Sequence, residues 1–240
     1  ITFVMTAFLV LAGSYSLYAL WDNGQVYAAA DNVQAELLKL KPEEKADNGA
    51  SFEELRKINQ DVCGWITLDH TNIDLPVLQG KDNLTYINTD VYGEFAMAGS
   101  IFLDSGCDRS FRQKYSLLYG HHMENHQMFG DLDLYKKENF FNKNRTGTLY
   151  LPEEQIHLEI LACLSVSSSE ENIFTPEKWE TDTKGLLKFA SDHAVLVQQD
   201  LLKELMESGD SPRILAMSTC SSEFTDARTV LLAEMKEEET

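Results

Sequence analysis

A cysteine, a histidine and an arginine stand where an acyl-transfer reaction could use them. Cys220 ends the segment RILAMSTC, His121 follows the glycine in YGHHM, and Arg228 begins RTVLLAEM. A cysteine thiol has a pKa of about 8.5, so acyl transfer at neutral pH needs a neighbouring base such as histidine. A guanidinium keeps its charge and can stabilise an oxygen on which negative charge develops. These residue types predict a nucleophile, a proton-transfer partner and an oxyanion stabiliser.

Each of the three residues begins or ends a segment whose composition predicts a β-strand. Strand ends are where a rigid sheet can present side chains to a cleft, so residues distant in sequence can converge there. Taken singly, each residue has a plainer interpretation. The cysteine could be a small buried residue, the histidine could bond to backbone, and the arginine could form a surface ion pair with Glu223 or Asp226. Only their combination favours catalysis.

The elements that must position these residues are short, β-rich runs. Glycine, asparagine, aspartate and proline separate them at short intervals, which is typical of a barrel or sandwich. Between Ser167 and Arg213 the pattern changes to a polar run followed by helical spacing, so an inserted helical loop is expected. Besides the segments that carry Cys220 and Arg228, the strand-like runs are GWITL, IDLPVLQ, GSIFLD, YSLLY, GTLYL and HLEILACLSV.

The N-terminal region predicts a membrane anchor. Residues 1–21 form an apolar run without a charged residue, close to the roughly 20 residues that span hydrocarbon. A cleaved signal peptide stays open because small residues such as Ala28 follow, although the run exceeds the usual signal core of about 7–15 residues. No Lys or Arg precedes Leu38, so we expect the rest of the chain outside the cell, on a single-pass membrane protein.

Three regions are predicted along the chain: a transmembrane anchor at residues 1–21, a helical stalk and linker at 22–50, and a catalytic domain at 51–240. Ser51 and Glu54 have the spacing of a capping box, so a short helix should open the domain. A chain of 240 residues is long enough for one such domain with a sizeable core.

Charge and cysteine usage exclude other classes of protein. A formal net charge of −19 argues against nucleic-acid binding, which needs clustered Lys and Arg to displace counterions from phosphates. The four scattered cysteines lack C-x-x-C spacing, which argues against a zinc knuckle or a dense disulfide framework. The three other than Cys220 are most simply core or incidental residues: Cys63, Cys107 and Cys163.

A metal site is not expected. The candidate ligands around the histidine pair fit neither an i,i+4 helical pair nor a known metal-binding loop; they are His121, His122, His126 and Glu124. No cofactor is expected either.

Several motifs resemble one known family in their order along the chain. From Ser51 to Met235 the sequence runs through FEELRKINQDVCGWITLDHTNIDLPVLQG, YINTD, GSIFLD, LLYGHHM, MFGDL and MSTC, with an arginine eight residues after the cysteine. This order resembles the class B sortases, cysteine transpeptidases of Gram-positive bacteria. The resemblance implies a mainly β fold: an eight-stranded sortase-type barrel with N-terminal helices and a helical insertion before the strand that carries the cysteine.

The resemblance also implies a role for each matching residue. Cys220 would be the nucleophile, His121 the proton-transfer partner and Arg228 the oxyanion stabiliser. His122 and His126 have no counterpart in the motif and are expected to be polar loop residues beside the cleft.

Three further residues are candidates for contact with the substrate. Ser218 and Thr219 could shape the pocket floor or donate to substrate, although strand packing explains them equally well. Glu223 lies between the cysteine and the arginine in sequence and could tune either charge.

By resemblance, the enzyme cleaves a C-terminal sorting motif of secreted proteins after Thr, through a thioester on Cys220. An amine of a cell-wall precursor or of a pilin Lys would accept the acyl group, and secreted surface proteins or pilins would be its partners. Two alternatives stay open. A hydrolytic cysteine peptidase would share the nucleophile and base, and a non-catalytic surface binding protein would keep the barrel for recognition alone.

Overall fold

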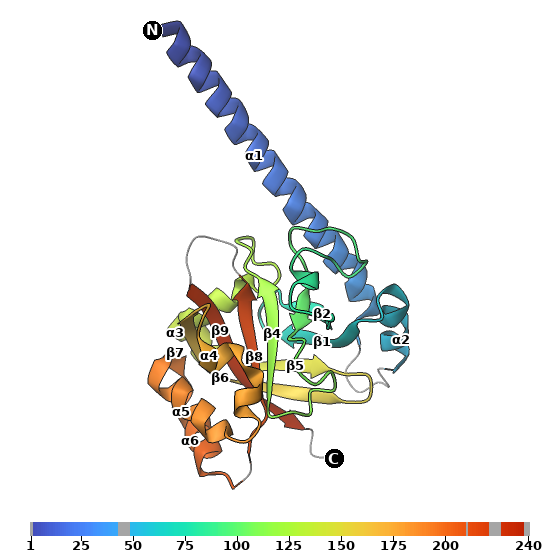
Figure 1. Ribbon diagram of the computed structural model, residues 1–240, viewed down its shortest axis with the longest axis vertical. Coiled ribbons are helices and arrows are strands. Elements are labelled where there is room, and N and C mark those ends of the chain that lie inside the picture. The colour runs from blue at the N-terminus through green and yellow to red at the C-terminus, as the bar shows by residue number, and fades with distance from the viewer. Residues whose placement is uncertain (1, 43–48, 210, 221–226, 238–240) are drawn as a thin grey trace.

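A long N-terminal helix rises from one end of a β-barrel (Figure 1). The computed structural model describes residues 2–42, 49–209, 211–220 and 227–237, with the backbone alone at Cys220 and Glu237. Within these residues the chain forms one long helix, a barrel, and a group of short helices on the outside of the barrel.

Eight strands close the barrel. They follow one another as β5-β1-β2-β3-β4-β8-β9-β6, and pairing of β6 with β5 completes the ring. Neighbours are antiparallel except for two parallel pairs, β2–β3 and β4–β8. The strands are β1 (Val62–Leu68), β2 (Asp74–Leu78), β3 (Ile101–Leu103), β4 (Tyr115–His121), β5 (Thr146–Tyr150), β6 (Gln155–Ser167), β8 (Ile214–Cys220) and β9 (Ala227–Glu237). The eight-stranded barrel predicted from sequence is confirmed.

A further strand, β7 (Ala194–Val197), pairs with β6 outside the ring. The sequence analysis did not predict it, because its four residues lie inside a segment with helical spacing. Short strands owe their form to the neighbour that they pair with rather than to their own composition.

The barrel interior is a continuous apolar core. Along β8 the residues Ile214, Leu215, Ala216 and Met217 are fully buried, and β9 contributes Val230, Leu231 and Leu232. Because consecutive residues of a strand point to opposite faces, these strands are buried on both sides, and any shift of a strand would require close-packed side chains to repack. The core therefore fixes the ends of β4, β8 and β9.

A short helix, α2 (Gly49–Ile58), lies before β1. It includes Gly49 and Ala50, so the prediction that Ser51 begins it was wrong. The apolar side of the helix is as predicted: Phe52 and Leu55 are buried and pack in a cluster with Trp65 of β1.

The helical insertion predicted between Ser167 and Arg213 is confirmed. It comprises α4 (Glu171–Phe174), a 3-10 helix at Pro176–Trp179, α5 (Thr183–His193) and α6 (Gln199–Glu207), and it covers one side of the barrel (Figure 1).

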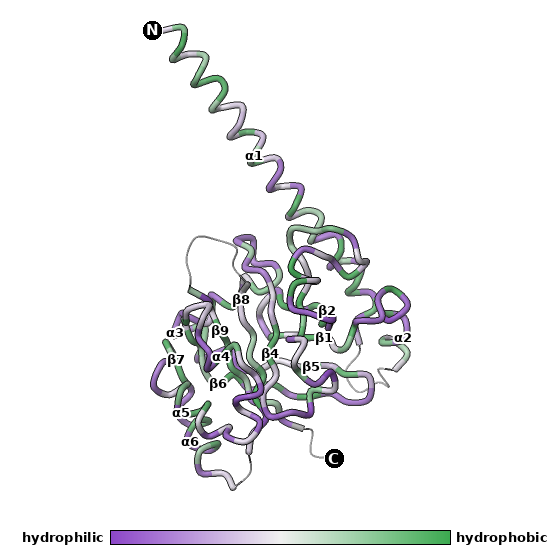
Figure 2. Tube along the Cα trace, viewed as in Figure 1, coloured by the Kyte–Doolittle hydropathy of each residue, from purple (hydrophilic) through white to green (hydrophobic). Residues whose placement is uncertain are grey.

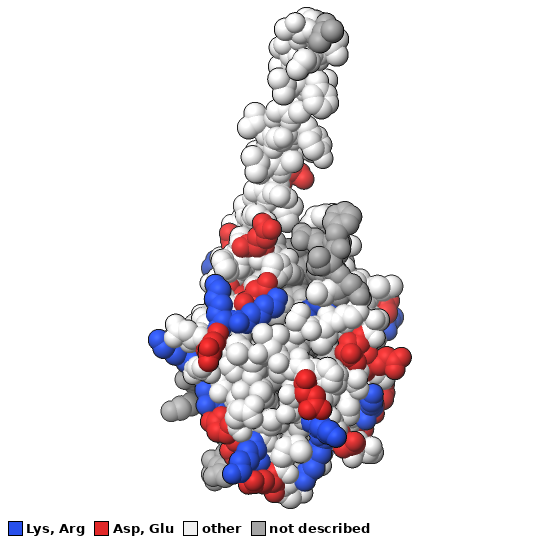
Figure 3. Space-filling view, turned by 90° about the vertical axis from the view of Figure 1, so that its left-hand side faces the viewer, with Lys and Arg blue, Asp and Glu red and all other residues white. Residues whose placement is uncertain are grey.

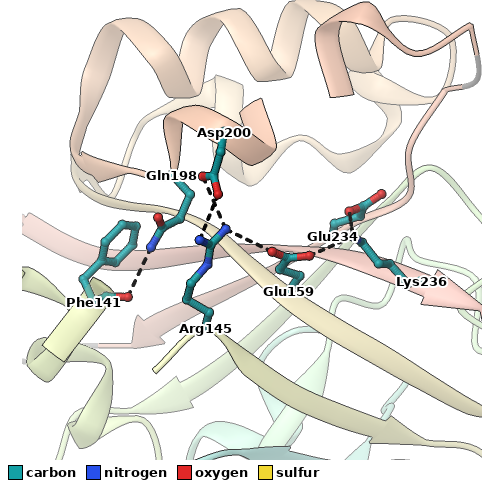
Figure 4. Close-up of polar contacts among 7 residues, drawn as sticks. All are labelled: Phe141, Arg145, Glu159, Gln198, Asp200, Glu234 and Lys236. Atoms are coloured by element: carbon teal, nitrogen blue, oxygen red, sulfur yellow. Dashed lines mark hydrogen bonds and ion pairs between the residues drawn. The ribbon is translucent and has the colours of Figure 1, made fainter. Parts of the chain in front are cut away.

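Polar contacts tie α6 to the barrel (Figure 4). Arg145 donates to Asp200 of α6 at 3.0 Å and to Glu159 of β6 at 3.0 Å. Lys236 of β9 pairs with the same Glu159 at 2.7 Å. Gln198, just before α6, donates to the carbonyl of Phe141 at 3.2 Å.

The first helix, α1 (Thr2–Leu37), runs without a break from the predicted anchor through the first part of the predicted stalk, residues 22–37. Among the described residues, only the segment Thr2–Leu40 is long and apolar enough to cross a membrane, with a mean hydropathy of 1.7 over its most apolar window. Figure 2 shows apolar residues along its outer part, and Figure 3 shows that part without charged side chains. The end of α1 nearer the domain packs on the barrel, where Ala30 and Leu37 are buried.

Candidate active site

The ends of β4 and β8 place the predicted histidine beside the predicted nucleophile. These strands are parallel and in register over seven residue pairs, from Tyr115↔Ile214 to His121↔Cys220. Neighbouring strands lie about 4.8 Å apart, so the backbones of His121 and Cys220 are adjacent. At Cys220 the structure describes only this backbone position.

Gly120 explains why glycine precedes the histidine. A Cβ at this position would lie 2.3 Å from the side chain of Ile101 and 2.8 Å from that of Phe129. Only glycine allows β3 and the loop after β4 to approach β4 this closely. The glycine thus sets how β4 packs immediately before His121.

The imidazole of His121 is held by a backbone carbonyl. Its Nε2 lies 2.7 Å from the oxygen of Ile87, in the 3-10 helix η2 (Thr85–Ile87). A carbonyl oxygen only accepts hydrogen bonds, so Nε2 carries a proton. In a neutral ring the lone pair then lies on Nδ1, which is the atom able to take up a further proton.

Arg228, the second residue of β9, lies against the end of β8. The two strands pair antiparallel as far as Ser218↔Val230. Beyond that pair, Arg228 Nη1 donates to the carbonyl oxygen of Thr219 at 3.4 Å, and the Thr229 amide donates to Thr219 Oγ1 at 3.1 Å. The guanidinium is therefore next to the residue that precedes Cys220.

A cleft of about 240 Å³ opens beside these strand ends. Ser218, Thr219 and Arg228 form one wall, so the structure brings three sequence-predicted residues to one cavity. Aromatic, aliphatic and polar side chains from other elements complete the lining: Asn83, Ile87, Phe102, Tyr119, Ser168 and Phe174. Glu223 lies outside the described residues.

Tyr119 organises the aromatic side of the cleft. Its hydroxyl donates to Asp104 Oδ2 at 3.0 Å. Its ring stacks on Phe174 at a centroid distance of 6.3 Å and an angle of 11° and lies 5.2 Å from Phe102. The sequence analysis missed Tyr119, although its place two residues before His121 in a strand was a signal, since alternate residues share a face.

The helical insertion contributes Ser168 and Phe174 to the cleft. The sequence analysis located the insertion but named neither residue. Which residue of an insertion reaches a cavity depends on how the segment folds back on the barrel, and local spacing does not carry this information.

His122 belongs to a different polar cluster, beside the strand ends. Its Nε2 lies 3.0 Å from Asp133 Oδ2. The other oxygen of Asp133 accepts from Thr229 Oγ1 at 2.6 Å and pairs with Lys136 at 2.7 Å. The hydrogen bond to His122, supported by those to Lys136 and Thr229, holds the pKa of Asp133 well below its usual range. Asp133 thus links His122, which follows His121, to Thr229, which follows Arg228.

His126 also lies in a loop with a carboxylate partner, since its Nδ1 is 2.7 Å from Asp131 Oδ1. His122 and His126 do not line the cleft, and neither does His121, whose ring instead bonds to the cleft residue Ile87. Within the described part of the chain, no group of three potential ligands could hold a metal ion.

The three other cysteines are buried thiols. Cys63, Cys107 and Cys163 are free and inaccessible. Burial raises the pKa of each to about 12. A thiol with such a pKa is a poor nucleophile at neutral pH. Their prediction as core residues is confirmed.

Comparison with known proteins adds independent information. No family model matches the sequence. The chain is 32% identical to sortase B of Listeria monocytogenes over 179 residues, covering 73% of this chain and 70% of the relative.

Two solved structures are also similar. A Staphylococcus aureus sortase B–substrate complex has a TM-score of 0.76 and 27% identity, covering 90% of this chain and 98% of that one. A Streptococcus pyogenes class B sortase involved in pilus biogenesis has a TM-score of 0.69 and 32% identity, covering 78% and 99%.

Proposed function

The chain belongs to the class B sortases, a family of cysteine transpeptidases, and we propose that it cleaves a sorting motif of secreted proteins and joins the acyl fragment to an amine. Cys220 is the nucleophile, His121 the proton-transfer partner and Arg228 the oxyanion stabiliser. The register pairing of His121 with Cys220, with Arg228 bonded to the preceding residue, is the observation that supports these roles most directly.

The first half of the reaction forms a thioester. The sulfur of Cys220 attacks the carbonyl carbon of the motif's Thr, and its proton passes to His121 Nδ1. Negative charge on the carbonyl oxygen is stabilised by the Arg228 guanidinium, which keeps its own protons. The amide bond then breaks, and His121 gives its proton to the departing amine.

The second half transfers the acyl group. An incoming amine attacks the thioester, loses a proton to His121, and the sulfur of Cys220 leaves and regains a proton. The product is a new amide bond and the free enzyme. The bond between His121 Nε2 and Ile87 suits both halves, because it leaves Nδ1 as the atom that gains and loses the proton.

The cleft supports recognition of an extended peptide. Tyr119, Phe102 and Phe174 offer apolar surface, while Ser218, Thr219 and Asn83 offer hydrogen-bonding groups. Pockets of this kind obtain affinity from apolar walls and orientation from a few polar groups. Ser218 and Thr219 are therefore proposed to contact substrate.

The acceptor is an amine of a cell-wall precursor or a pilin Lys. One neighbour in structure is a sortase of pilus biogenesis, and that protein supports the second option. Helix α1 anchors the enzyme in the membrane, with residues 1–21 as the span and the catalytic domain on the outer side.

A peptide screen tests this function. Purified full-length protein in detergent is incubated with five-residue peptides, and intact-mass spectrometry detects an adduct on Cys220. Hydroxylamine or an added amine is then supplied. A hydroxamate or amide product is expected. Release of free acid alone, at any amine concentration, would show a hydrolytic peptidase, and the lack of any adduct with every peptide would favour a binding protein.

A further inference from the structure

Two large apolar side chains are exposed on a loop next to the root of α1. We call residues 89–98, between η2 and β3, the shoulder loop; Figure 1 shows the segment between η2 and β3 where α1 leaves the domain. Within this loop Phe95 is 76% exposed and Met97 is 62% exposed. Exposed apolar groups that cluster at one place mark an interaction site more often than scattered ones do.

The shoulder loop is held in shape, so the exposure of these side chains is not a result of a loose conformation. Asp90 donates its amide to the carbonyl of Glu94 at 2.9 Å, and the Gly93 amide donates back to Asp90 at 3.1 Å. Gly93 has a φ of +81°, which glycine adopts without strain. The Tyr92 hydroxyl donates to Glu36 of α1 at 2.9 Å and links the loop to the helix.

An apolar groove of about 300 Å³ lies between the shoulder loop and α1. Phe95 and Met97 line it from the loop, and Val26 and Ala29 line it from the helix. The groove is continuous with the part of α1 that leads into the apolar outer segment.

Helix α1 is fixed on the domain below this groove. Gln34 of the helix donates to the carbonyl of Asn72 at 3.1 Å, and Lys41, just after the helix, pairs with Asp74 at 2.7 Å. Gln127 bonds to Asp31. A membrane that contains the outer part of α1 therefore meets the domain at a defined place.

The position of the membrane surface follows from the residues of α1. Tyr18 and Trp21, with ring centroids 6.1 Å apart, are residue types that favour the membrane–water interface. Gln25 and Val26 of the groove are four and five residues further on, or roughly 6–8 Å at 1.5 Å per residue. The interfacial layer on each side of the hydrocarbon is roughly 5–8 Å thick. The rim of the groove thus lies at the depth of that layer.

We propose that Phe95 and Met97 of the shoulder loop insert into the interfacial layer of the membrane that α1 spans. The domain is then held to the bilayer at two places, α1 and the shoulder loop, which sets the orientation of the cleft toward the membrane. The proposal rests on the proposed anchoring by α1. Phe95 and Met97 carry no charge, so the contact is apolar and gains nothing from anionic lipids, which a chain with a net charge of −19 does not attract.

A fluorescence experiment on the full chain tests the contact. Met97→Cys in a Cys220→Ala background is labelled with an environment-sensitive dye, since the three buried cysteines resist labelling, and is reconstituted in phosphatidylcholine vesicles. The matched control is Met206→Cys on α6, which is 40% exposed and lies on the insertion. We expect blue-shifted emission and several-fold stronger quenching by shallow spin-labelled lipids at position 97 than at 206, with no gain on adding phosphatidylglycerol.

Flotation of the vesicles distinguishes failure of the proposed loop contact from failure of the proposed anchoring by α1. If the protein floats but positions 97 and 206 are quenched equally, the loop contact is overturned and the anchor stands. If the protein does not float, both are overturned. A signal at position 97 that needs phosphatidylglycerol would contradict the apolar nature of the contact. Phe95→Ser with Met97→Ser should keep peptide activity in detergent, because neither residue lines the cleft, and should lower the quenching of a dye at Glu94→Cys, an exposed position of the same loop.

Discussion

His121 and Cys220 are register partners at the ends of the parallel strands β4 and β8. Parallel strands cannot be joined by a tight turn, so a crossover must connect them. Here the intervening chain forms β5, β6 and the whole helical insertion. The pairing that brings the histidine to the cysteine therefore depends on the complete barrel, and single substitutions can separate the roles of its residues.

The paired histidines should differ in their effect on activity. His121→Ala should abolish peptide cleavage and thioester formation, because it removes the group that we propose transfers the proton. His122→Ala should keep activity within about tenfold, since its ring bonds to Asp133, which is not a residue of the cleft. The measurement is kcat/KM with a cleavable peptide, together with the adduct mass. Equal loss in both variants would show that His121 is wrongly assigned.

Removing the guanidinium should slow turnover. Arg228→Ala should lower kcat by about 10²–10³-fold with a smaller change in KM, as loss of one oxyanion donor does elsewhere. Arg228→Lys is the control that keeps the charge but loses the planar donor pair, and it should fall in between. Activity of the alanine variant close to that of the wild type would remove Arg228 from the mechanism.

Thiol reactivity should single out one cysteine. At pH 7 a limiting amount of iodoacetamide should modify Cys220, while the buried Cys63, Cys107 and Cys163 stay unmodified in the native protein because their pKa values are raised to about 12. Peptide mapping by mass spectrometry reads this out. Cys220→Ala should take up no label until it is unfolded. Rapid labelling of any of the buried three would contradict the structure.

The aromatic wall should affect substrate binding. Phe174→Ala removes the ring that stacks on Tyr119 and should raise KM several-fold with little change in kcat. Phe189→Ala is the matched control, because Phe189 belongs to the same insertion but stacks on His193 away from the cleft. Steady-state kinetics on both variants measure the change in KM and in kcat. A similar rise in KM for the control would assign the effect to general loosening of the insertion.

Asp133 should make stability depend on pH. Its pKa is depressed in the folded state, so its stabilising contribution is present above its unfolded pKa of about 3.9 and is lost as the pH falls through the folded value. Asp133→Asn should therefore be less stable than the wild type above pH about 5, with the difference shrinking as the pH falls below about 4. Urea unfolding at several pH values measures this. A constant difference across the range would contradict the contribution of the ionised carboxylate.

Much of this architecture follows from local sequence. The strand runs predicted from β-branched and aromatic residues correspond to the eight strands of the barrel, because such runs, separated by turn-forming residues, favour short strands. The apolar run at the N-terminus lies in one long helix. Other local signals were less reliable. The capping-box spacing at Ser51 placed the start of α2 too late, since the helix includes Gly49.

Some features of the candidate site could also be predicted from the sequence, and others depend on the tertiary structure. The residue types, their places at strand ends and the order of the family motifs along the chain were enough to predict roles for His121, Cys220 and Arg228, because these signals are all present in the sequence. The bond from His121 to Ile87, the stacking of Phe174 on Tyr119 and the link between Asp133 and Thr229 appear only in the folded chain. Each joins elements far apart in sequence, and their distance is set by how the whole core packs rather than by any local preference.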